Sequence, residues 1–494
     1  VSTSGHYGLV TGEVFPLKLY IFFNFLLPKN KQTNMLGSID LPDCVYSKEP
    51  ILITPISPTP NHTLYLSNLD DQMFLRFSIK YLYLFTKSIN LEKLKYSLSR
   101  VLVDYYPLAG RLRKSCPGND HKLKVDCNGE GAIFAEAFLD LSADELLVVS
   151  NKPDKSWKKL LYKVEAQSFL DIPPLVVQVT NLRCGGMILC TSINHCLCDG
   201  IGTAQFLHAW AHYTRDPTIS SPITPFHSRH VLKPRDPTEI TSIHPAFTKI
   251  PLNTPNPQFS LNLHQYLQSQ PISPASITFS QSQILHLKRQ CSPSVKSTSF
   301  EVLASHTWRC WVKSLDLPSS VNVKLLFSVN IRKTVKPELP QGYYGNGFVL
   351  GCAEAPVKQV VNGNLQDTVK LVQHAKSELT NDTVKSIVDL LDDKTVITDL
   401  SASLVISQWS RLSLEEVNFG EGKPIQMGPL TSDIYCLFLP SVGEIDAVRV
   451  LVSLPENVVK KFEYYMKELW EVHDVNGDII KGHLQYENHK MISA

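Results

Sequence analysis

The sequence has little excess charge of either sign. Its 48 lysines and arginines nearly balance its 46 aspartates and glutamates, which leaves a formal net charge of +2. A protein that binds nucleic acid usually carries an excess of basic residues over the binding face. The composition therefore predicts no nucleic-acid partner, and any anionic ligand must be held by a local group of donors.

Metal modules and disulfide frameworks also find no support in the sequence. The 11 cysteines form an odd set and lack the C-x-x-C pairs of a zinc module. Their density is far below that of a small secreted scaffold. We expect reduced and mostly buried thiols, no metal, and a cytoplasmic protein.

Apolar runs near the amino end are too short to cross a membrane. Residues 19–27 are apolar apart from one asparagine, whereas a spanning helix needs roughly 20 residues. No small-residue cleavage site of a signal peptide follows them. A coherent pattern begins only at the first methionine, Met35. We therefore expect residues 1–34 to be an extension outside the fold, and no membrane span.

The chain has enough apolar residues for large cores. Hydrophobic residues make up 43% and charged residues 19%, which are ordinary values for globular proteins. A single core stops growing near about 250–300 residues, so 494 residues predict two domains. Residues 216–275 contain eleven prolines and little periodicity, which is typical of a long surface crossover. We expect an N-terminal domain over residues 35–215 and a C-terminal domain over residues 276–494.

Apolar periodicity predicts a mixed α/β fold, in which strands and helices alternate. Alternating or continuous apolar runs predict strands at residues 73–86, 174–180, 187–194, 324–330, 402–407, 433–440 and 447–454. Apolar residues three or four positions apart predict helices at residues 91–105, 201–213, 300–312, 366–380, 384–392 and 457–470.

The most informative short segment is Asn194-His-Cys-Leu-Cys-Asp-Gly200, which links a predicted buried strand to a predicted helix. An imidazole has a reference pKa of about 6.5, so it is largely neutral at physiological pH and can accept a proton from a hydroxyl. We expect His195 to be a general base. Asp199 could orient this imidazole as in a catalytic triad, or it could point away and fix the loop through an arginine.

A thiol or metal site is the other interpretation of this segment, because Cys196 and Cys198 lie beside His195. Alternate residues of an extended link point in opposite directions, and no second pair of ligands follows at a suitable spacing. The pattern therefore favours the general base.

Further segments occur in a fixed order around His195. They are Tyr106-Pro-Leu-Ala-Gly-Arg111, His195-x-x-x-Asp199-Gly200, Ser299-Phe-Glu-Val-Leu303 with His306-Thr-Trp308, Val329-Asn-Ile-Arg332, Tyr344-Gly-Asn346, Asn418-Phe-Gly-Glu-Gly-Lys-Pro424 and Met427-Gly-Pro429. This ordered set, within about residues 40–470, resembles the plant BAHD acyltransferases, which are coenzyme A-dependent enzymes of specialised and cuticular metabolism.

The resemblance implies two chloramphenicol acetyltransferase-like α/β domains with a channel between them. His195 would deprotonate an alcohol or amine acceptor, which attacks the thioester of a hydroxycinnamoyl, acetyl or fatty acyl-coenzyme A. Acyl-coenzyme A would be a co-substrate, with no permanently bound cofactor, and the protein would be a monomer. The resemblance also implies that Asp199 pairs with Arg332 and, together with Gly200, supports the site.

The phosphates of coenzyme A need local donors on a nearly neutral chain. The resemblance implies that a coenzyme-contacting strand and the late segments supply them. The candidates are Lys296, Ser297, Ser299, Ser407, Trp409, Gly420 and Gly422.

The late motif departs from the family pattern. Relatives usually have Asp-Phe-Gly-Trp-Gly, whereas this chain has Asn418-Phe-Gly-Glu-Gly422. The differences remove one charge and replace a large apolar side chain with the carboxylate of Glu421. Two interpretations remain: an active enzyme with altered coenzyme affinity, or a non-catalytic partner protein of very-long-chain lipid and wax metabolism.

Overall fold

The computed structural model describes residues 40–473, apart from residues 117–118, 151, 242, 250–269 and 431–434, and it also describes residues 479–481. All of these residues belong to one compact unit that begins at Asp40. Residues 1–34, the predicted extension, lie outside the described residues. None of the helices in the described part of the chain combines the length and hydrophobicity needed to cross a bilayer.

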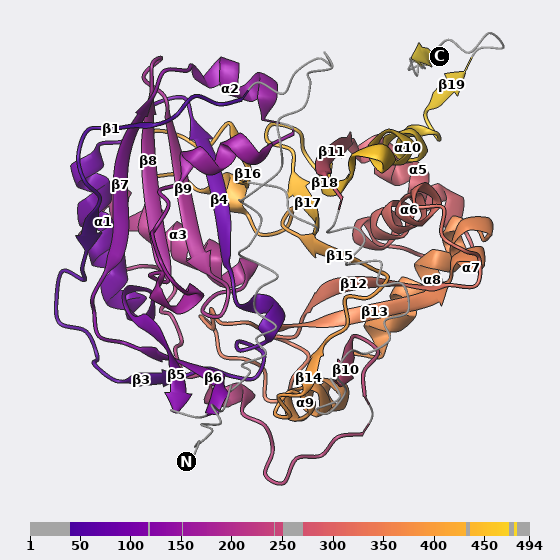
Figure 1. The fold of residues 1–494 in the computed structure, drawn as a ribbon, viewed down its shortest axis with the longest axis horizontal. Helices are drawn as coiled ribbons and strands as arrows, with labels where there is room; N and C mark the ends of the chain where they lie inside the picture. The colour runs from indigo at the N-terminus through magenta and orange to yellow at the C-terminus, as the bar shows by residue number, and fades with distance from the viewer. Residues whose placement is uncertain are drawn as a thin grey trace, which may run out of the picture. The chain divides into compact units, whose positions relative to one another are not determined.

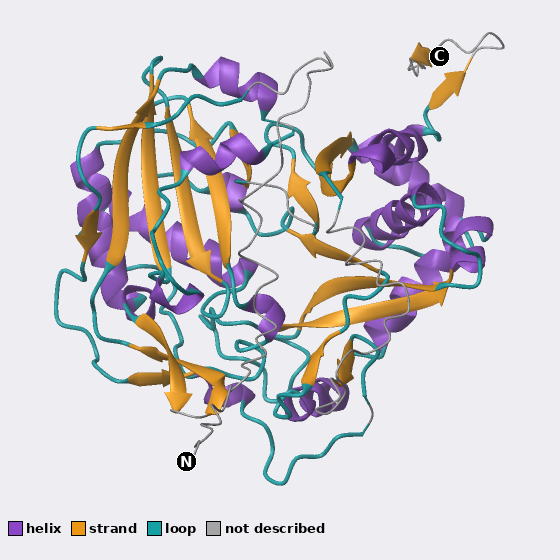
Figure 2. Cartoon of the chain, viewed as in Figure 1, coloured by secondary structure: helices purple, strands orange, loops and turns teal. Residues whose placement is uncertain are grey.

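Two large β-sheets with helices packed against them make up the mixed α/β fold (Figure 1 and Figure 2). The first sheet has the strand order β1-β7-β8-β9-β4-β16, and β2 also pairs with β7. Its strands are β1 (Val45–Tyr46), β2 (Ile51–Ile53), β4 (Ser78–Phe85), β7 (Ala132–Leu139), β8 (Leu175–Leu182), β9 (Met187–Asn194) and β16 (Gln426–Pro429). Every residue of β9 is buried, as expected for a strand that is covered on both faces.

The second sheet has the strand order β11-β18-β17-β15-β12-β13. Its strands are β11 (Ile272–Phe279), β12 (Asn322–Asn330), β13 (Phe348–Pro356), β15 (Ser403–Gln408), β17 (Cys436–Pro440) and β18 (Val448–Pro455). Smaller sheets are formed by β3 (Thr63–Tyr65), β5 (Arg111–Cys116) and β6 (Asn119–Asp126), by β10 (Phe247–Lys249) and β14 (Val396–Thr398), and by β19 (Glu471–His473) and β20 (Ile479–Lys481).

The helices cover the faces of the sheets. They are α1 (Leu91–Asp104), α2 (Ala143–Val149), α3 (Gly200–Arg215), α5 (Gln281–Cys291), α6 (Ser299–Ser314), α7 (Val357–Asn362), α8 (Leu365–Ser377), α9 (Asn381–Leu390) and α10 (Glu456–Lys467). Helix α3 packs against α1, and α6 packs against α8 and α10. Short 3-10 helices include η2 (Met73–Leu75), η6 (Arg229–Leu232) and η7 (Leu414–Glu416).

The predicted helices all form, with ends that differ by a few residues, because their apolar faces and caps are local features. Asn90 caps α1 by accepting a hydrogen bond from Lys93 N. The predicted strand at residues 73–86 divides into η2 and β4. Of the predicted strand at residues 433–440, residues 433–434 lie outside the described part and β17 begins at Cys436.

Two predictions need correction. Residues 296–299 are not a strand: Thr298 caps α6 and forms a capping box with Glu301, so Ser299 is the first helical residue. The proline-rich crossover is not confined to the surface, because Arg229 within it is 0% exposed. Proline density reports the lack of regular structure in a segment, and it does not report the depth at which the segment runs.

Strand β16 comes from the late part of the chain and completes the first sheet. It pairs antiparallel with β4, and Met427 lies opposite Tyr83. Arg449 of β18 in the second sheet donates from Nη2 to the carbonyl oxygen of Met427 at 3.0 Å. The predicted boundary between residues 35–215 and 276–494 stays a prediction, but the first sheet draws on both segments.

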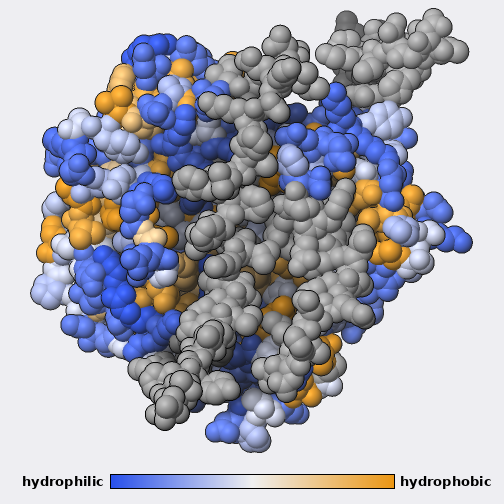
Figure 3. Space-filling view, viewed as in Figure 1, coloured by the Kyte–Doolittle hydropathy of each residue, from blue (hydrophilic) through white to orange (hydrophobic). Residues whose placement is uncertain are grey.

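The face shown in Figure 3 carries hydrophobic residues in separate patches between hydrophilic ones. Large apolar side chains are most exposed at single positions such as Val148 and Ile445. Scattered exposed apolar residues are normal for globular proteins. The hydropathy of the described residues on this face therefore does not by itself mark a binding site.

Candidate active site

His195 follows β9 directly and stands just before α3. Its N–H donates to the carbonyl oxygen of Phe77 at 2.9 Å, next to the pairing of β9 with β4. The side-chain oxygen of Asn194 accepts a hydrogen bond from Cys196 N at 3.0 Å, and its carbonyl oxygen accepts one from Leu197 N at 3.0 Å. These bonds turn the chain and fix the backbone of the loop.

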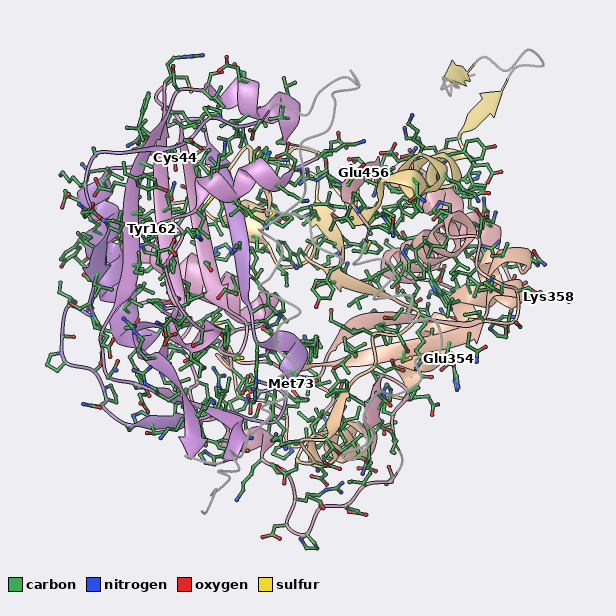
Figure 4. All side chains as sticks on the ribbon, in the orientation of Figure 1. Cys44, Met73, Tyr162, Glu354, Lys358 and Glu456 are labelled. Carbon is green, nitrogen blue, oxygen red and sulfur yellow. The ribbon has the colours of Figure 1, made fainter. Side chains whose placement is uncertain are left out.

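An aromatic ring from the link before β4 and one from the first residue of β13 flank the imidazole. The ring of Phe77, which follows η2 and precedes β4, lies 5.4 Å from the His195 ring, edge to face. The ring of Phe348, the first residue of β13, lies at 6.0 Å. Figure 4 labels Met73 on η2, the segment that leads to Phe77. The two sheets therefore meet at the side chain of His195.

The imidazole is neutral at physiological pH. Burial lowers the pKa of His195 from 6.5, and its own backbone, Asn346 and the carboxylates of Asp199 and Asp70 act in the opposite direction. The residue is half-buried. Its Nδ1 is buried and has no hydrogen-bond partner among the described residues. A neutral ring can accept a proton from a hydroxyl group.

Asp199 uses both carboxylate oxygens away from the imidazole. Oδ2 accepts from Arg332 Nη1 at 2.8 Å and Oδ1 from Arg332 Nη2 at 3.0 Å, which is the bidentate geometry of a strong pair. Oδ1 also caps α3 through Gly202 N at 2.8 Å, and Oδ2 accepts from Gly347 N at 3.0 Å. Of the two roles that the sequence left open, these contacts match the pairing with an arginine.

Arg332 also binds the turn that precedes β13. Its Nη2 donates to the carbonyl oxygens of Tyr343 and Gly345 at 3.2 and 3.0 Å. Helix α3 approaches this turn so closely that a Cβ atom on Gly202 would lie 1.8 Å from the carbonyl oxygen of Tyr344. A glycine is therefore required at that position of α3.

The chain after β15 packs against α3 and β4. A Cβ atom on Gly200 would lie 2.7 Å from Leu412 Cδ1. The ring of Trp409 is buried and lies 4.7 Å from the ring of Tyr81 in β4. Ser407 is half-buried in β15. The structure thus brings Trp409 and Gly200 to the first sheet, while Ser407 stays in the second.

The late motif keeps its loop in spite of the asparagine. Asn418 Oδ1 accepts hydrogen bonds from Gly420 N at 2.8 Å and Gly422 N at 3.3 Å. The two glycines have φ angles of +116° and +108°, which only glycine adopts readily. Arg215 of α3 donates to the carbonyl oxygen of Asn418, and Glu421 is exposed. An amide oxygen is a sufficient acceptor for both N–H groups.

The other coenzyme candidates lie at the start of α6, over the second sheet. Lys296 is exposed, and its carbonyl oxygen accepts from Gln373 Nε2 at 2.9 Å. Ser297 Oγ is buried without a hydrogen-bond partner in the described part of the chain. Ser299 is half-buried. These three residues lie at the start of α6, whereas Gly420 and Gly422 lie in the loop before β16, so the candidates form two groups.

The thiols beside His195 are not suited to catalysis. Cys196 and Cys198 are buried, and burial raises the pKa of both thiols far from neutrality. A thiolate is the reactive form of cysteine, and it does not form at such positions near pH 7. Within the residues that the structure describes, no group of three or more His, Cys, Asp or Glu residues could hold a metal ion.

Sequence reasoning missed two buried charges under the His195 loop. Arg229 donates from Nη2 to the carbonyl oxygen of Leu197 at 2.9 Å. Its Nε lies 3.9 Å from Oδ2 of Asp70, and both side chains are 0% exposed. A single arginine in a proline-rich segment carries no periodic signal, so only its position in space reveals the contact.

His195 lies where the two large sheets meet, and the carboxylate of Asp199 in the same loop is paired with Arg332. A family model described as the Transferase family matches residues 45–469. The chain belongs to this family, the BAHD acyltransferases, and it is an acyltransferase.

Curated relatives match almost over their full length. The omega-hydroxypalmitate O-feruloyl transferase of Arabidopsis thaliana is 35% identical over 85% of this chain and 92% of its own. The fatty alcohol:caffeoyl-CoA acyltransferase of the same plant is 34% identical over 85% of this chain and 98% of its own. The benzyl alcohol O-benzoyltransferase of Petunia hybrida is 33% identical over 92% of this chain and 97% of its own.

Solved structures share the fold. Vinorine synthase superimposes with a TM-score of 0.63 at 21% identity, over 85% of this chain and 97% of that one. The TRI101 protein of F. sporotrichioides, solved with coenzyme A and T-2, gives a TM-score of 0.65 at 15% identity, over 81% of this chain and 97% of its own. The mixed α/β class predicted from the sequence is confirmed.

Proposed function

We propose that the protein transfers an acyl group from acyl-coenzyme A to an alcohol, with His195 as the general base. The observation that carries this proposal is the neutral imidazole between Phe77 and Phe348, where the two large sheets meet. Membership of an acyltransferase family supplies the class of reaction.

The base atom that we assign is Nε2 of His195, because Nδ1 is buried. Nε2 takes the hydroxyl proton as the acceptor oxygen attacks the thioester carbon. The tetrahedral intermediate then collapses, the bond between carbon and sulfur breaks, and the thiolate takes the proton back from the imidazolium. The products are an ester and free coenzyme A, so the reaction needs one base and two positioned substrates.

The relatives suggest the substrates. The two Arabidopsis relatives are named for a feruloyl or caffeoyl group and for a hydroxylated fatty acid or a fatty alcohol. The segments at residues 55–61 and 65–70 resemble the same branch of the family. We propose a hydroxycinnamoyl-coenzyme A donor and a long-chain alcohol acceptor, which meet in a channel at His195. An acetyl or fatty acyl donor and an amine acceptor belong in the test panel.

The remaining residues support this chemistry. Asp199, Gly200 and Arg332 hold the loop, and the coenzyme contacts are assigned to the α6 group (Lys296, Ser297, Ser299) and to the late group (Ser407, Trp409, Gly420, Gly422). Coenzyme A is a co-substrate in this scheme, and no cofactor stays bound. We also propose that the protein is a cytoplasmic monomer; its scattered cysteines without paired spacing are typical of reduced thiols in the cytosol.

The test is to offer purified protein a panel of acyl-coenzyme A donors and alcohol or amine acceptors and to follow the release of free thiol. We expect release that depends on the acceptor and disappears in His195→Ala. His374→Ala, at an exposed position of α8, is the matched control and should keep full activity. No release from the wild-type protein over the whole panel would favour the non-catalytic partner, and release that survives His195→Ala would remove the assigned base.

A further inference from the structure

Two side chains that the scheme above does not use hold the carbonyl groups of the His195 loop. Asn346 Nδ2 donates to the carbonyl oxygen of His195 at 2.8 Å. Arg229 Nη2 donates to the carbonyl oxygen of Leu197 at 2.9 Å. The two donors thus bind the backbone of the residues on either side of Cys196, one of which is His195 itself.

Asp70 connects these two donors. Its Oδ1 accepts from the backbone N and from Nδ2 of Asn346 at 2.9 and 3.0 Å. Its Oδ2 lies 3.9 Å from Arg229 Nε and is also bound by the N and Oγ of Ser67 at 3.0 and 2.6 Å. Asp70, Arg229 and Asn346 are each 1% exposed or less. Burial of charges at that depth is costly unless they are paired. Asp70 is hydrogen-bonded through both oxygens, whereas Arg229 has this ion pair and the bond to Leu197, and its Nε and Nη1 have no hydrogen-bond partner among the described residues.

Two tyrosine rings and a glycine surround the guanidinium of Arg229. Its carbon lies 4.4 Å from the ring centre of Tyr344 and 5.1 Å from that of Tyr343. A Cβ atom on Gly345 would lie 2.0 Å from Arg229 Nη1. Glycine at position 345 therefore leaves room for the arginine, and the aromatic pair favours the planar cation over an ammonium group.

We propose that Arg229, Asp70 and Asn346 form a positioning triad that holds the backbone of His195 and thereby sets the place of its imidazole. This inference rests on the proposed function of His195. The triad brings together three distant parts of the chain: the segment before η2, the proline-rich crossover, and the turn before β13. Its effect is on the reaction step, since a base displaced by about 1 Å can lower the rate on the order of a hundredfold.

The central test compares Arg229→Lys with the wild-type protein. Lysine keeps the charge but loses the fork of donors and the ring stacking. We expect kcat to fall by about tenfold or more, with KM for donor and acceptor within about twofold, because binding contacts are untouched. The control is Arg235→Lys in the same crossover, where Arg235 pairs with Asp389 at 2.7 Å. That variant should keep the wild-type kcat.

Asn346→Ser carries the test alone if Arg229→Lys does not fold, and the double variant completes it when both single variants fold. We expect Asn346→Ser to lower kcat with little change in KM, and the double variant to fall by less than the product of the two single effects, because both act on one loop. A folded Arg229→Lys or Asn346→Ser protein with wild-type kcat overturns the triad, and so do independent effects in the double variant. An inactive wild-type protein, or an active His195→Ala variant, would instead contradict the proposed function.

Discussion

At the scale of single residues, His195 is held by its backbone, and no carboxylate in the described part of the chain hydrogen-bonds its ring. Its N–H and its carbonyl oxygen both have partners, whereas the buried Nδ1 has none among the described residues. The imidazole therefore depends on the loop for its place and on burial for its neutrality. In this respect the site differs from a catalytic triad, in which a buried aspartate binds the imidazole directly.

This arrangement predicts how the activity depends on pH. A base works only when it is neutral, so kcat/KM falls as the pH drops through the pKa of His195. Burial lowers this pKa below 6.5, and the facing carboxylates of Asp70 and Asp199, paired with Arg229 and Arg332, only partly oppose the shift. We expect kcat/KM at pH 6.5 to be more than half of its plateau value. A profile of kcat/KM between about pH 5 and 8 checks this, and a midpoint above 6.5 would contradict it.

Asp199 should matter for stability as well as for activity. In Asp199→Ala, Arg332 loses its bidentate partner and α3 loses its cap. Breaking such a buried pair lowers the free energy of unfolding by roughly 3–5 kcal/mol. Urea denaturation should show this loss, whereas Asp140→Ala, which breaks an exposed pair with Arg183, should change it by about 1 kcal/mol or less. An inactive Asp199→Ala protein of normal stability would instead indicate a triad role.

The late motif differs from the family pattern in sequence, yet its loop keeps its backbone hydrogen bonds. Asn418 supplies the oxygen that the loop needs, and Glu421 in the position of the usual tryptophan is exposed. The loop geometry therefore gives no ground for regarding the protein as a degraded, non-catalytic relative. Its affinity for coenzyme A depends on contacts that a binding measurement with the purified protein will settle.

At the scale of elements, the fit between α3 and the turn before β13 depends on one glycine. A Cβ atom at position 202 would lie 1.8 Å from the carbonyl oxygen of Tyr344, so Gly202→Ala must push α3 away from the turn. We expect the free energy of unfolding to fall by about 1–3 kcal/mol and kcat to fall with it. His208→Ala, a substitution on the same helix, is the control for thermal denaturation. A Gly202→Ala protein as stable as the wild type would show that the turn can move.

Elements with local signals could be predicted from the sequence, and elements that depend on distant partners could not. Helices α1 and α3 show periodic apolar faces and capping residues, and β8 and β9 are continuous apolar runs. Strand β16 has four residues, and its partner β4 lies far earlier in the chain. Nothing in such a short segment indicates that pairing.

The same contrast holds for the site. The segment from His195 to Asp199 and Arg332 both lie in segments that resemble the family, so the sequence alone could identify them as site residues. Asp70 ends a segment that resembles the family and Arg229 lies in no such segment, but the role of both follows only from the contacts with Leu197 and Asn346. Buried charges that bind backbone groups leave no sequence pattern, so the three-dimensional structure is needed to find their contacts.

At the scale of the whole molecule, the two large sheets are joined by shared parts. Strand β16 completes the first sheet, Arg449 of the second sheet binds Met427 in β16, and Arg332 of the second half of the chain binds Asp199 of the first half. We therefore expect a single calorimetric unfolding transition for the full chain, in which calorimetric and van't Hoff enthalpies agree. Two separate transitions would show that the sheets unfold independently.

The late origin of β16 also bears on the synthesis of the protein. Until Gln426 to Pro429 have left the ribosome, β4 stands as an open edge with unpaired backbone groups, and such edges promote aggregation. A transcript or a proteolytic cut that ends the chain before residue 426 therefore yields more than a shortened enzyme. It yields a polypeptide with an exposed strand edge that promotes aggregation, and we expect chaperones to bind it or proteases to degrade it.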